Sequence, residues 1–169
     1  FNQVNKMTVM VNMILDSSRA DINKADILIE EVNLNEWINF LLEDYRIDCY
    51  GKGFSLKFIM DNSIGTVSID KRIIETGLSN MVNNAIKYTA EGSVTLSVEC
   101  ERQEDGIVKM VYTVEDTGMG IKKEDIPYLF TAFKLVDEGN TKHIEGTGLG
   151  LSIVKQFLDL MGGKVTVNS

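Results

Sequence analysis

A chain of 169 residues with 44% hydrophobic residues is long enough for one domain with an appendage, and apolar enough for a core. Its formal net charge of −8 argues against a nucleic-acid-binding surface, since phosphate backbones are held by surplus lysine and arginine. No apolar run approaches the ~20 residues that cross a bilayer, and the amino end lacks the zones of a secretory signal.

The cysteines, the single histidine and the first residue indicate the cellular environment and the kinds of site that the chain can form. Two cysteines without metal-ligand or disulfide spacing indicate reduced thiols in a cytosolic environment. The single histidine, His143, argues against a histidine-based metal site. Phe1 in place of methionine predicts a piece of a longer protein.

The first elements in the chain are predicted to be helices. Residues 1–24 carry apolar side chains at the spacing of a heptad seam, which favours a partner helix, although packing on the chain's own domain stays open. A second helix is expected after Asn33 or Asn35 as its cap, with Gly51 and Gly53 at its end. The seam residues are Val4, Met7, Val11 and Ile14.

The middle of the chain alternates strands with helices. Asp70 is expected to cap a helix that runs to about Thr89, and residues 152–161 form another helix that stops at Gly162 and Gly163. Residues 117–150 are irregular, and so long an irregular stretch usually has a function. Period-two alternation predicts a hairpin with Asp105-Gly106 in its turn, as well as other strands. The predicted strands are residues 54–60, 66–69, 94–100, 108–114 and 164–167.

The helix that begins at Asp70 has a polar face. Steps of about 100° per residue place Asn80, Asn84 and Lys87 together, because their spacings are four and three. Carboxamide oxygens suit Mg²⁺, and Lys87 would add a positive charge for the same phosphates. A solvated polar face is the alternative. The residues expected on the opposite, buried face are Ile74, Leu78, Met81, Val82 and Ala85.

Two glycine-bearing turns carry further chemistry. In residues 116–120 a carboxylate at a strand end can accept a hydrogen bond from an exocyclic amine while a ring lies against glycine backbone; the alternative is a plain turn. In residues 146–151 three glycines run into a helix start, which suits a phosphate, although ordinary tight turns share the pattern. No lysine follows these glycines until Lys155, so any counter-charge must come from Lys87 and an Asn84-held Mg²⁺.

In combination these stretches resemble the motifs of bacterial sensor histidine kinases, in that family's order. Residues 80–89 resemble the N box, 116–120 the G1 box, Phe130 and Phe133 the F box, and 146–150 the G2 box. The resemblance implies two domains. Residues 1–30 would be the second helix of a dimerisation and phosphoacceptor hairpin, and 31–169 an ATP-binding catalytic domain without its last strand.

The fold that this resemblance implies is the Bergerat ATP-binding fold. It is an α+β fold, a two-layer α/β sandwich whose mixed, mostly antiparallel sheet is covered by helices on one face, here with a coiled-coil-like helix in front. The implied function is binding of Mg²⁺-ATP and transfer of the γ-phosphoryl group to a histidine on a hairpin helix that is not in this chain. A non-catalytic nucleotide-binding or dimerisation and signal-relay module of the same fold is the alternative.

The resemblance also assigns roles to residues of this chain. Asn84 would be the Mg²⁺ ligand, with Asn80 and Lys87 near the phosphates as the other catalytic residues. Tyr88 would pack near the base and Asp116 would bind the adenine amine, while residues 134–145, His143 among them, would form a lid. The remaining ATP-binding residues would be Gly118, Gly120, Ile121, Phe130, Phe133, Gly146, Thr147, Gly148, Leu149, Gly150 and Leu151.

The chain departs from the family pattern in two respects. The acceptor helix is absent, and His143 has no acidic neighbour arranged as in an acceptor motif, so the fragment should not phosphorylate itself. Hydrolysing members of the superfamily have a glutamate where this chain has Asn80, which favours transfer over hydrolysis. Expected partners are ATP or ADP, the acceptor hairpin and a response-regulator receiver domain. The parent protein is expected to be membrane-anchored and to dimerise through the leading helix, and this chain would be a cytoplasmic part of it.

Overall fold

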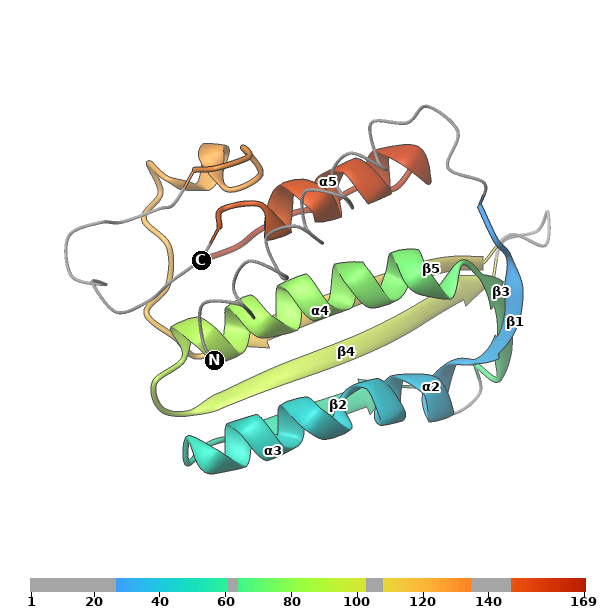
Figure 1. The fold of residues 1–169 in the computed structure, drawn as a ribbon, viewed down its shortest axis with the longest axis horizontal. Helices are drawn as coiled ribbons and strands as arrows, with labels where there is room; N and C mark the ends of the chain where they lie inside the picture. Colours follow the sequence, from blue (N-terminus) through green and yellow to red (C-terminus); the bar gives the residue numbers. More distant parts are fainter. Residues whose placement is uncertain (1–26, 61–63, 103–107, 135–146) are drawn as a thin grey trace, which may run out of the picture. The chain divides into compact units, whose positions relative to one another are not determined.

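The computed structural model describes residues 27–60, 64–102, 108–134 and 147–169, which belong to two compact units (Figure 1). The first unit is Leu28–Gly120. The second contains, of the described residues, Ile27, 121–134 and 147–169. The predicted helix of residues 1–24 and the hairpin turn at Asp105-Gly106 lie outside the described residues.

The strands of the first unit form two sheets. In the larger one β2 (Ser55–Met60) pairs in parallel with β4 (Ser93–Arg102), and β4 pairs antiparallel with β5 (Val108–Asp116). In the smaller one β1 (Glu30–Asn33) and β3 (Thr66–Ile69) are antiparallel. The predicted hairpin and the mixed, mostly antiparallel strand arrangement are therefore confirmed.

Three helices cover one face of the larger sheet (Figure 1). They are α2 (Leu34–Leu41), α3 (Glu43–Gly51) and α4 (Lys71–Tyr88). Two of them begin at predicted side-chain caps, since the Asn33 carboxamide accepts a hydrogen bond from the Glu36 N–H at 3.4 Å and Asp70 accepts one from the Arg72 N–H at 3.1 Å.

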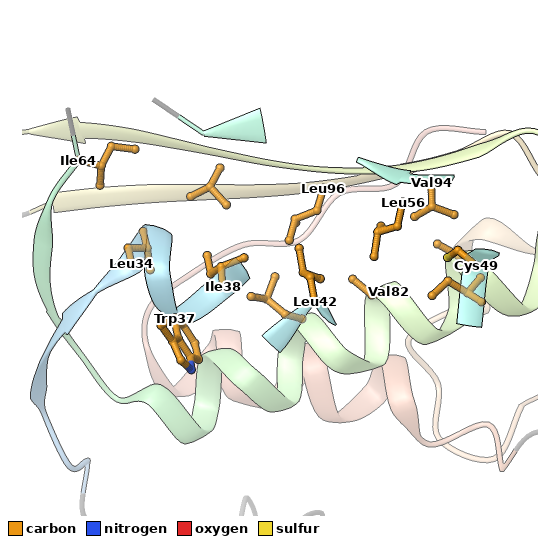
Figure 2. Packing of buried hydrophobic residues seen from close by; sticks show 14 of the residues in the cluster. Leu34, Trp37, Ile38, Leu42, Cys49, Leu56, Ile64, Val82, Val94 and Leu96 are labelled. Atoms are coloured by element: carbon orange, nitrogen blue, oxygen red, sulfur yellow. The ribbon is translucent and has the colours of Figure 1, made fainter. Parts of the chain in front are cut away.

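The core lies between the helices and the sheet, and Figure 2 shows the two layers with apolar side chains packed between them. On β4 the alternate residues Val94, Leu96 and Val98 are buried, whereas Glu99 is exposed. Period-two alternation in the sequence thus corresponds to one face packed on helices and one face open. The predicted two-layer α/β sandwich is confirmed for this unit.

Asp70 joins the start of α4 to the segment before β1. Its carboxylate is buried and accepts hydrogen bonds from the Leu28 N–H at 2.9 Å and from Arg72 Nη2 at 2.8 Å. The hydrogen bond from the Arg72 side chain is the main cause that holds the pKa of Asp70 below its ordinary value. The carboxylate therefore stays ionised in the fold, where it serves as both cap and anchor.

The second unit contains a 3-10 turn, η1 (Ile126–Tyr128), and helix α5 (Gly150–Leu160). The helix ends as predicted at two glycines. The Gly163 N–H donates to Leu158 O at 2.7 Å and the Gly162 N–H donates to Asp159 O at 3.3 Å, while Gly162 has φ 68°. This pair of bonds is a Schellman motif, which satisfies carbonyls that a helix end leaves open.

The structure departs from the sequence predictions at three places. The single helix expected after Asn33 or Asn35 is broken at Leu42 into α2 and α3. Strand β1, which ends at the cap residue of α2, was not predicted, because only Val32 of its residues is buried and the strand is too short and too exposed to show alternation. Residues 164–167 keep alternating exposure but form no strand in the described part of the chain, because a strand also needs a hydrogen-bonded neighbour.

Candidate functional site

The polar face of α4 is present as the residue spacing requires. Asn80, Asn84 and Lys87 are all partly exposed, whereas Leu78 and Val82 are buried. Ile74 and Met81 are partly buried against the same core that Ala85 enters. Because apolar packing holds one face of the helix, its opposite face can present the carboxamides and the ammonium group together.

The two asparagines differ in what they contact. The Asn80 Nδ2 donates to Thr76 O at 3.0 Å, so its amide nitrogen is engaged by the helix backbone. The Asn84 carboxamide makes no hydrogen bond within the part of the chain that the structure describes. Its neighbour Asn83 is exposed and its Nδ2 donates to Tyr45 Oη at 3.4 Å. Asn84 is therefore the member of the set whose whole carboxamide, its oxygen included, is unengaged among the described residues.

Lys87 and Tyr88 form a local pair at the end of α4. Lys87 Nζ donates to Tyr88 Oη at 3.2 Å and lies 4.8 Å from the centroid of that ring. The ring holds the ammonium group by a cation–π contact. The lysine is thereby kept on the same side of the helix end as the tyrosine.

The end of α4 meets the turn after β5. The Met119 N–H donates to Tyr88 O at 3.3 Å, and the Gly118 N–H donates to Asp116 Oδ1 at 2.9 Å. A Cβ on Gly118 would lie 2.4 Å from Tyr88 O, so only glycine permits this approach. The structure thus places two sequence motifs, residues 80–89 and 116–120, side by side.

The same turn is also tied to the start of β4. The Ser93 N–H donates to Thr117 Oγ1 at 2.9 Å, and the Thr117 N–H donates to Ser93 O at 3.1 Å. Gly92 has φ 114°, and a Cβ there would lie 2.0 Å from Thr117 Oγ1. Sequence reasoning missed Gly92 and Ser93 as supports of Asp116, and the glycine directly before a predicted strand was the available signal.

Thr89 is a further residue that sequence reasoning left without a role. It is 2% exposed, directly follows Tyr88, and its Oγ1 is buried without a hydrogen-bond partner among the described residues. A buried hydroxyl that stays unpaired costs about 1–3 kcal/mol, so such an atom ordinarily meets a water or a ligand. An unpaired donor and acceptor beside Tyr88 and Gly118 fits a polar ligand at this turn.

The second unit holds the other predicted nucleotide residues. The Phe133 N–H donates to Gly148 O at 3.0 Å, and both residues have positive φ, 62° and 69°. This bond joins the two ends of the predicted lid, whose residues 135–145 lie outside the described residues, as do Gly146 and His143. Phe130 is partly buried and Phe133 exposed, and the Ile121 N–H donates to Ser169 Oγ at 2.6 Å.

Among the described residues, no side chain caps the start of α5. Its cap position is Leu149, which has no side chain able to accept a hydrogen bond, in contrast to Asn33 and Asp70 at the starts of α2 and α4. Gly150 and Leu151 occupy the first two helical positions, and the Leu149 N–H donates to Thr147 Oγ1 at 3.4 Å. Free N–H groups and the positive end of the helix dipole make this turn suitable for an anion such as phosphate.

Acidic, thiol and imidazole side chains form no metal-binding cluster in the part of the chain that the structure describes. Within the described residues no group of three or more histidine, cysteine, aspartate or glutamate side chains is placed to hold a metal ion. A carboxamide such as that of Asn84 fits Mg²⁺, which takes few protein ligands and keeps waters and phosphate oxygens as the rest. None of the helices in the described ranges combines the length and the apolar character of a membrane span.

Comparison with known proteins identifies this arrangement. A family model described as "Histidine kinase-, DNA gyrase B-, and HSP90-like ATPase" matches residues 69–169. Hybrid signal transduction histidine kinase B of Dictyostelium discoideum is 33% identical over 166 residues, which make up 98% of this chain and 8% of that protein. The chain spans only a small part, 8% to 30%, of the curated relatives that it matches.

Solved structures agree with the family match. The catalytic domain of histidine kinase ThkA, in a nucleotide-free form, is 28% identical with a TM-score of 0.63, over 78% of this chain and 80% of that chain. Full-length ShkA in complex with AMPPNP shares the fold with a TM-score of 0.79 at 23% identity, over 95% of this chain and 32% of that chain. The chain therefore belongs to the histidine kinase-, DNA gyrase B- and HSP90-like ATPase family, and it carries an ATP-binding catalytic domain similar to those of sensor histidine kinases.

Proposed function

We propose that this domain binds ATP with Mg²⁺ and directs the γ-phosphoryl group to a histidine of a phosphoacceptor hairpin. The family match to residues 69–169 is the observation that carries the proposal. The meeting of Tyr88 and Gly118 supports it, because it joins the helix that bears Asn84 to the turn that bears Asp116. The helix that would hold the metal and the turn that would bind the base thus lie within a single unit.

Each group has a distinct task in this proposal. Asn84 would hold Mg²⁺, which neutralises phosphate charge when bound, and Lys87 would add a mobile positive charge. Asp116 would accept a hydrogen bond from the adenine amine with its oxygen that Gly118 does not engage, while Tyr88 would lie near the base. The open donors at the start of α5, Gly150 among them, would bind phosphate oxygens.

Transfer is favoured over hydrolysis by the residue at position 80. Water has to lose a proton when it attacks phosphorus, and a carboxylate in position would accept that proton. Asn80 is an amide with no such basicity, and its Nδ2 is already bonded to Thr76 O. In transfer the bond between the γ-phosphorus and the bridging oxygen of ADP breaks while a bond to the acceptor histidine nitrogen forms.

The wider assembly is also part of the proposal. Residues 1–30 would be the second helix of the hairpin, and residues 31–169 would be the catalytic domain. The parent protein would dimerise through the hairpin helix and be anchored at a membrane. It would phosphorylate a response-regulator receiver domain. The match to the Dictyostelium kinase supports the division, because it extends over 98% of this chain and therefore beyond the family match. The acceptor histidine would lie on the hairpin's other helix.

Trans-phosphorylation tests the activity. The chain is mixed with γ-labelled ATP, Mg²⁺ and the separately expressed hairpin of the same parent, and an acid-labile, base-stable label on the hairpin is the expected result. Asn84→Ala should abolish the label, whereas Asn83→Ala should keep it, because Asn83 is exposed and bonded to Tyr45. Equal labelling by both variants would contradict the assignment of Asn84.

Calorimetry, combined with the labelling assay, distinguishes kinase activity from the alternative function, a non-catalytic nucleotide-binding or relay module. Binding of Mg²⁺-ATP without any label on the hairpin would favour that alternative. Asp116→Ala should weaken ATP binding about 10- to 100-fold, the value of a hydrogen bond to a charged group, and should remove the preference for ATP over GTP. An unchanged preference for adenine would mean that Asp116 does not read the base.

A further inference from the structure

A second surface feature is lined by no residue of the nucleotide motifs. It is a groove of about 340 Å³ formed by β1, by the first two turns of α2 and by the first residue of α4. All of these elements belong to the first unit. The side chains that matter below are Glu30, Glu31, Glu36, Trp37, Phe40 and Lys71.

Two aromatic rings give the groove its apolar character. Trp37 is only 8% exposed and lies at the margin of the buried cluster, so its position is held by the core (Figure 2). Phe40, one helical turn further on α2, is 83% exposed. A large ring left in water beside a fixed indole gains free energy when a partner covers it.

Acidic side chains surround these rings. Glu31 and Glu36 are exposed and take part in no ion pair within the described residues. The pKa of the Arg72 guanidinium is raised mainly by its hydrogen bond with Asp70 and to a lesser extent by the charge of Glu30, so Glu30 is partly compensated. Lys71 is the one basic residue of the lining, with Nζ 5.7 Å from the centroid of the Trp37 ring. The indole face already accepts a cation from within the chain.

We propose that this groove is a docking site for a cationic segment of a partner protein. An arginine or lysine of that segment would lie against Trp37 and Phe40 and between Glu31 and Glu36, joining a cation–π contact to charge pairing. The occupant would touch β1 and the first residue of α4, next to the Asp70 anchor. This inference does not depend on nucleotide binding, since none of the lining residues belongs to the proposed ATP site.

Tryptophan fluorescence offers a direct measurement, because Trp37 is the only tryptophan of the chain. The probes are two capped peptides, Ala-Arg-Leu-Arg-Ala and Ala-Glu-Leu-Glu-Ala, titrated at low salt. The arginine peptide should change the emission saturably, and the effect should fade at high salt. The glutamate peptide should not change it. Equal effects of both peptides would overturn the proposal.

Variants of opposite charge make the test specific. Glu31→Gln and Glu36→Gln should each weaken binding of the arginine peptide about two- to fivefold, which corresponds to an exposed ion pair. Lys71→Gln should strengthen it by a similar factor, because a like charge is removed and the indole face is freed. Glu99→Gln, on the open face of β4, is the matched control and should bind as the unmodified chain does. Weaker binding by Lys71→Gln, or no change in the two glutamate variants, would refute the cationic occupant.

Discussion

Position 118 requires glycine, because the carbonyl oxygen of Tyr88 lies where a Cβ atom would be. At the level of single residues, such close approaches decide whether the nucleotide motifs meet. Gly92 is under a similar constraint, with φ 114° and the Thr117 hydroxyl against it. These glycines allow the turn that carries Asp116 to approach Tyr88 and the start of β4.

Gly118→Ala should therefore destabilise the fold by about 1–3 kcal/mol and weaken ATP binding, because the added Cβ forces the turn away from Tyr88. Gly77→Ala is the matched control on α4, since nothing lies within 4 Å of a Cβ there. In the helix interior it should stabilise the fold by about 0.5–1 kcal/mol. Urea unfolding measures both free energies, and similar losses in the two variants would contradict the steric explanation.

Asp70 leads to a prediction about pH. Its pKa is lowered in the folded state, so its charged form stabilises the fold above the ordinary pKa of 3.8, and that contribution is lost as pH falls through the lower folded value. Asp70→Asn keeps a good cap but loses the charge, so it should be less stable than the unmodified chain at pH 7 and approach it below about pH 4. Asp70→Ala should lose about 1 kcal/mol more at pH 7, from the cap. Unfolding curves from pH 7 to 3 test this, and a pH-independent gap between the aspartate and asparagine forms would contradict it.

At the level of elements, the ends of the helices are set by local chemistry. α2 and α4 begin at Asn33 and Asp70, whose side chains accept backbone N–H groups. α5 begins without such a cap and ends in a Schellman motif at Gly162. The start of α5 thus has no side-chain cap among the described residues, while its far end is closed by backbone hydrogen bonds.

Gly162→Ala tests the far end of α5. The substitution should lower the free energy of unfolding by about 1 kcal/mol, because a φ of 68° disfavours any residue with a side chain. No steric clash contributes, since nothing lies within 4 Å of the added Cβ. Gly51→Ala, in the last position of α3, meets no atom either and has no positive φ, so it should be neutral or stabilising. Thermal unfolding compares the two, and equal melting temperatures would exclude a purely conformational cost at Gly162.

At the level of the whole molecule, the predicted nucleotide residues are divided between the two units, with Asn80 to Gly120 in one and Ile121 to Leu151 in the other. A ligand that binds only the folded chain stabilises it by mass action. The stability of the entire domain is therefore a readout of the proposed site.

Mg²⁺-ATP at about 100 times its Kd should add about 2.7 kcal/mol to the free energy of unfolding and raise the melting temperature. Chelation of the metal, or the Asn84→Ala substitution, should remove most of this increase. Differential scanning fluorimetry with ATP, GTP and a chelator makes the comparison. A shift that is unaffected by chelation would argue against a metal-held nucleotide.

Much of this protein was predictable from local patterns. The hairpin of β4 and β5, the strand β3 and the caps of α2 and α4 follow from alternation and from side chains that compete for backbone groups. The placement of Asn80, Asn84 and Lys87 on one face follows too, because helix geometry fixes the angle between residues three and four apart. Composition and motif order were enough to indicate the family, which the comparison confirmed.

Other features depended on contacts between residues far apart in the sequence. β1 is a strand because β3 pairs with it, whereas residues 164–167 alternate and form no strand among the described residues. The approach of Tyr88 to Gly118 and the groove beside Trp37 likewise could not be predicted from the sequence, and only a glycine before a predicted strand indicated the support of Asp116 by Gly92 and Ser93. The sequence by itself determined periodicity, capping and motif identity, because these depend on residues within a few positions of one another. Only the tertiary structure decided which strands pair and which turns touch, because those bonds form between groups that folding brings together.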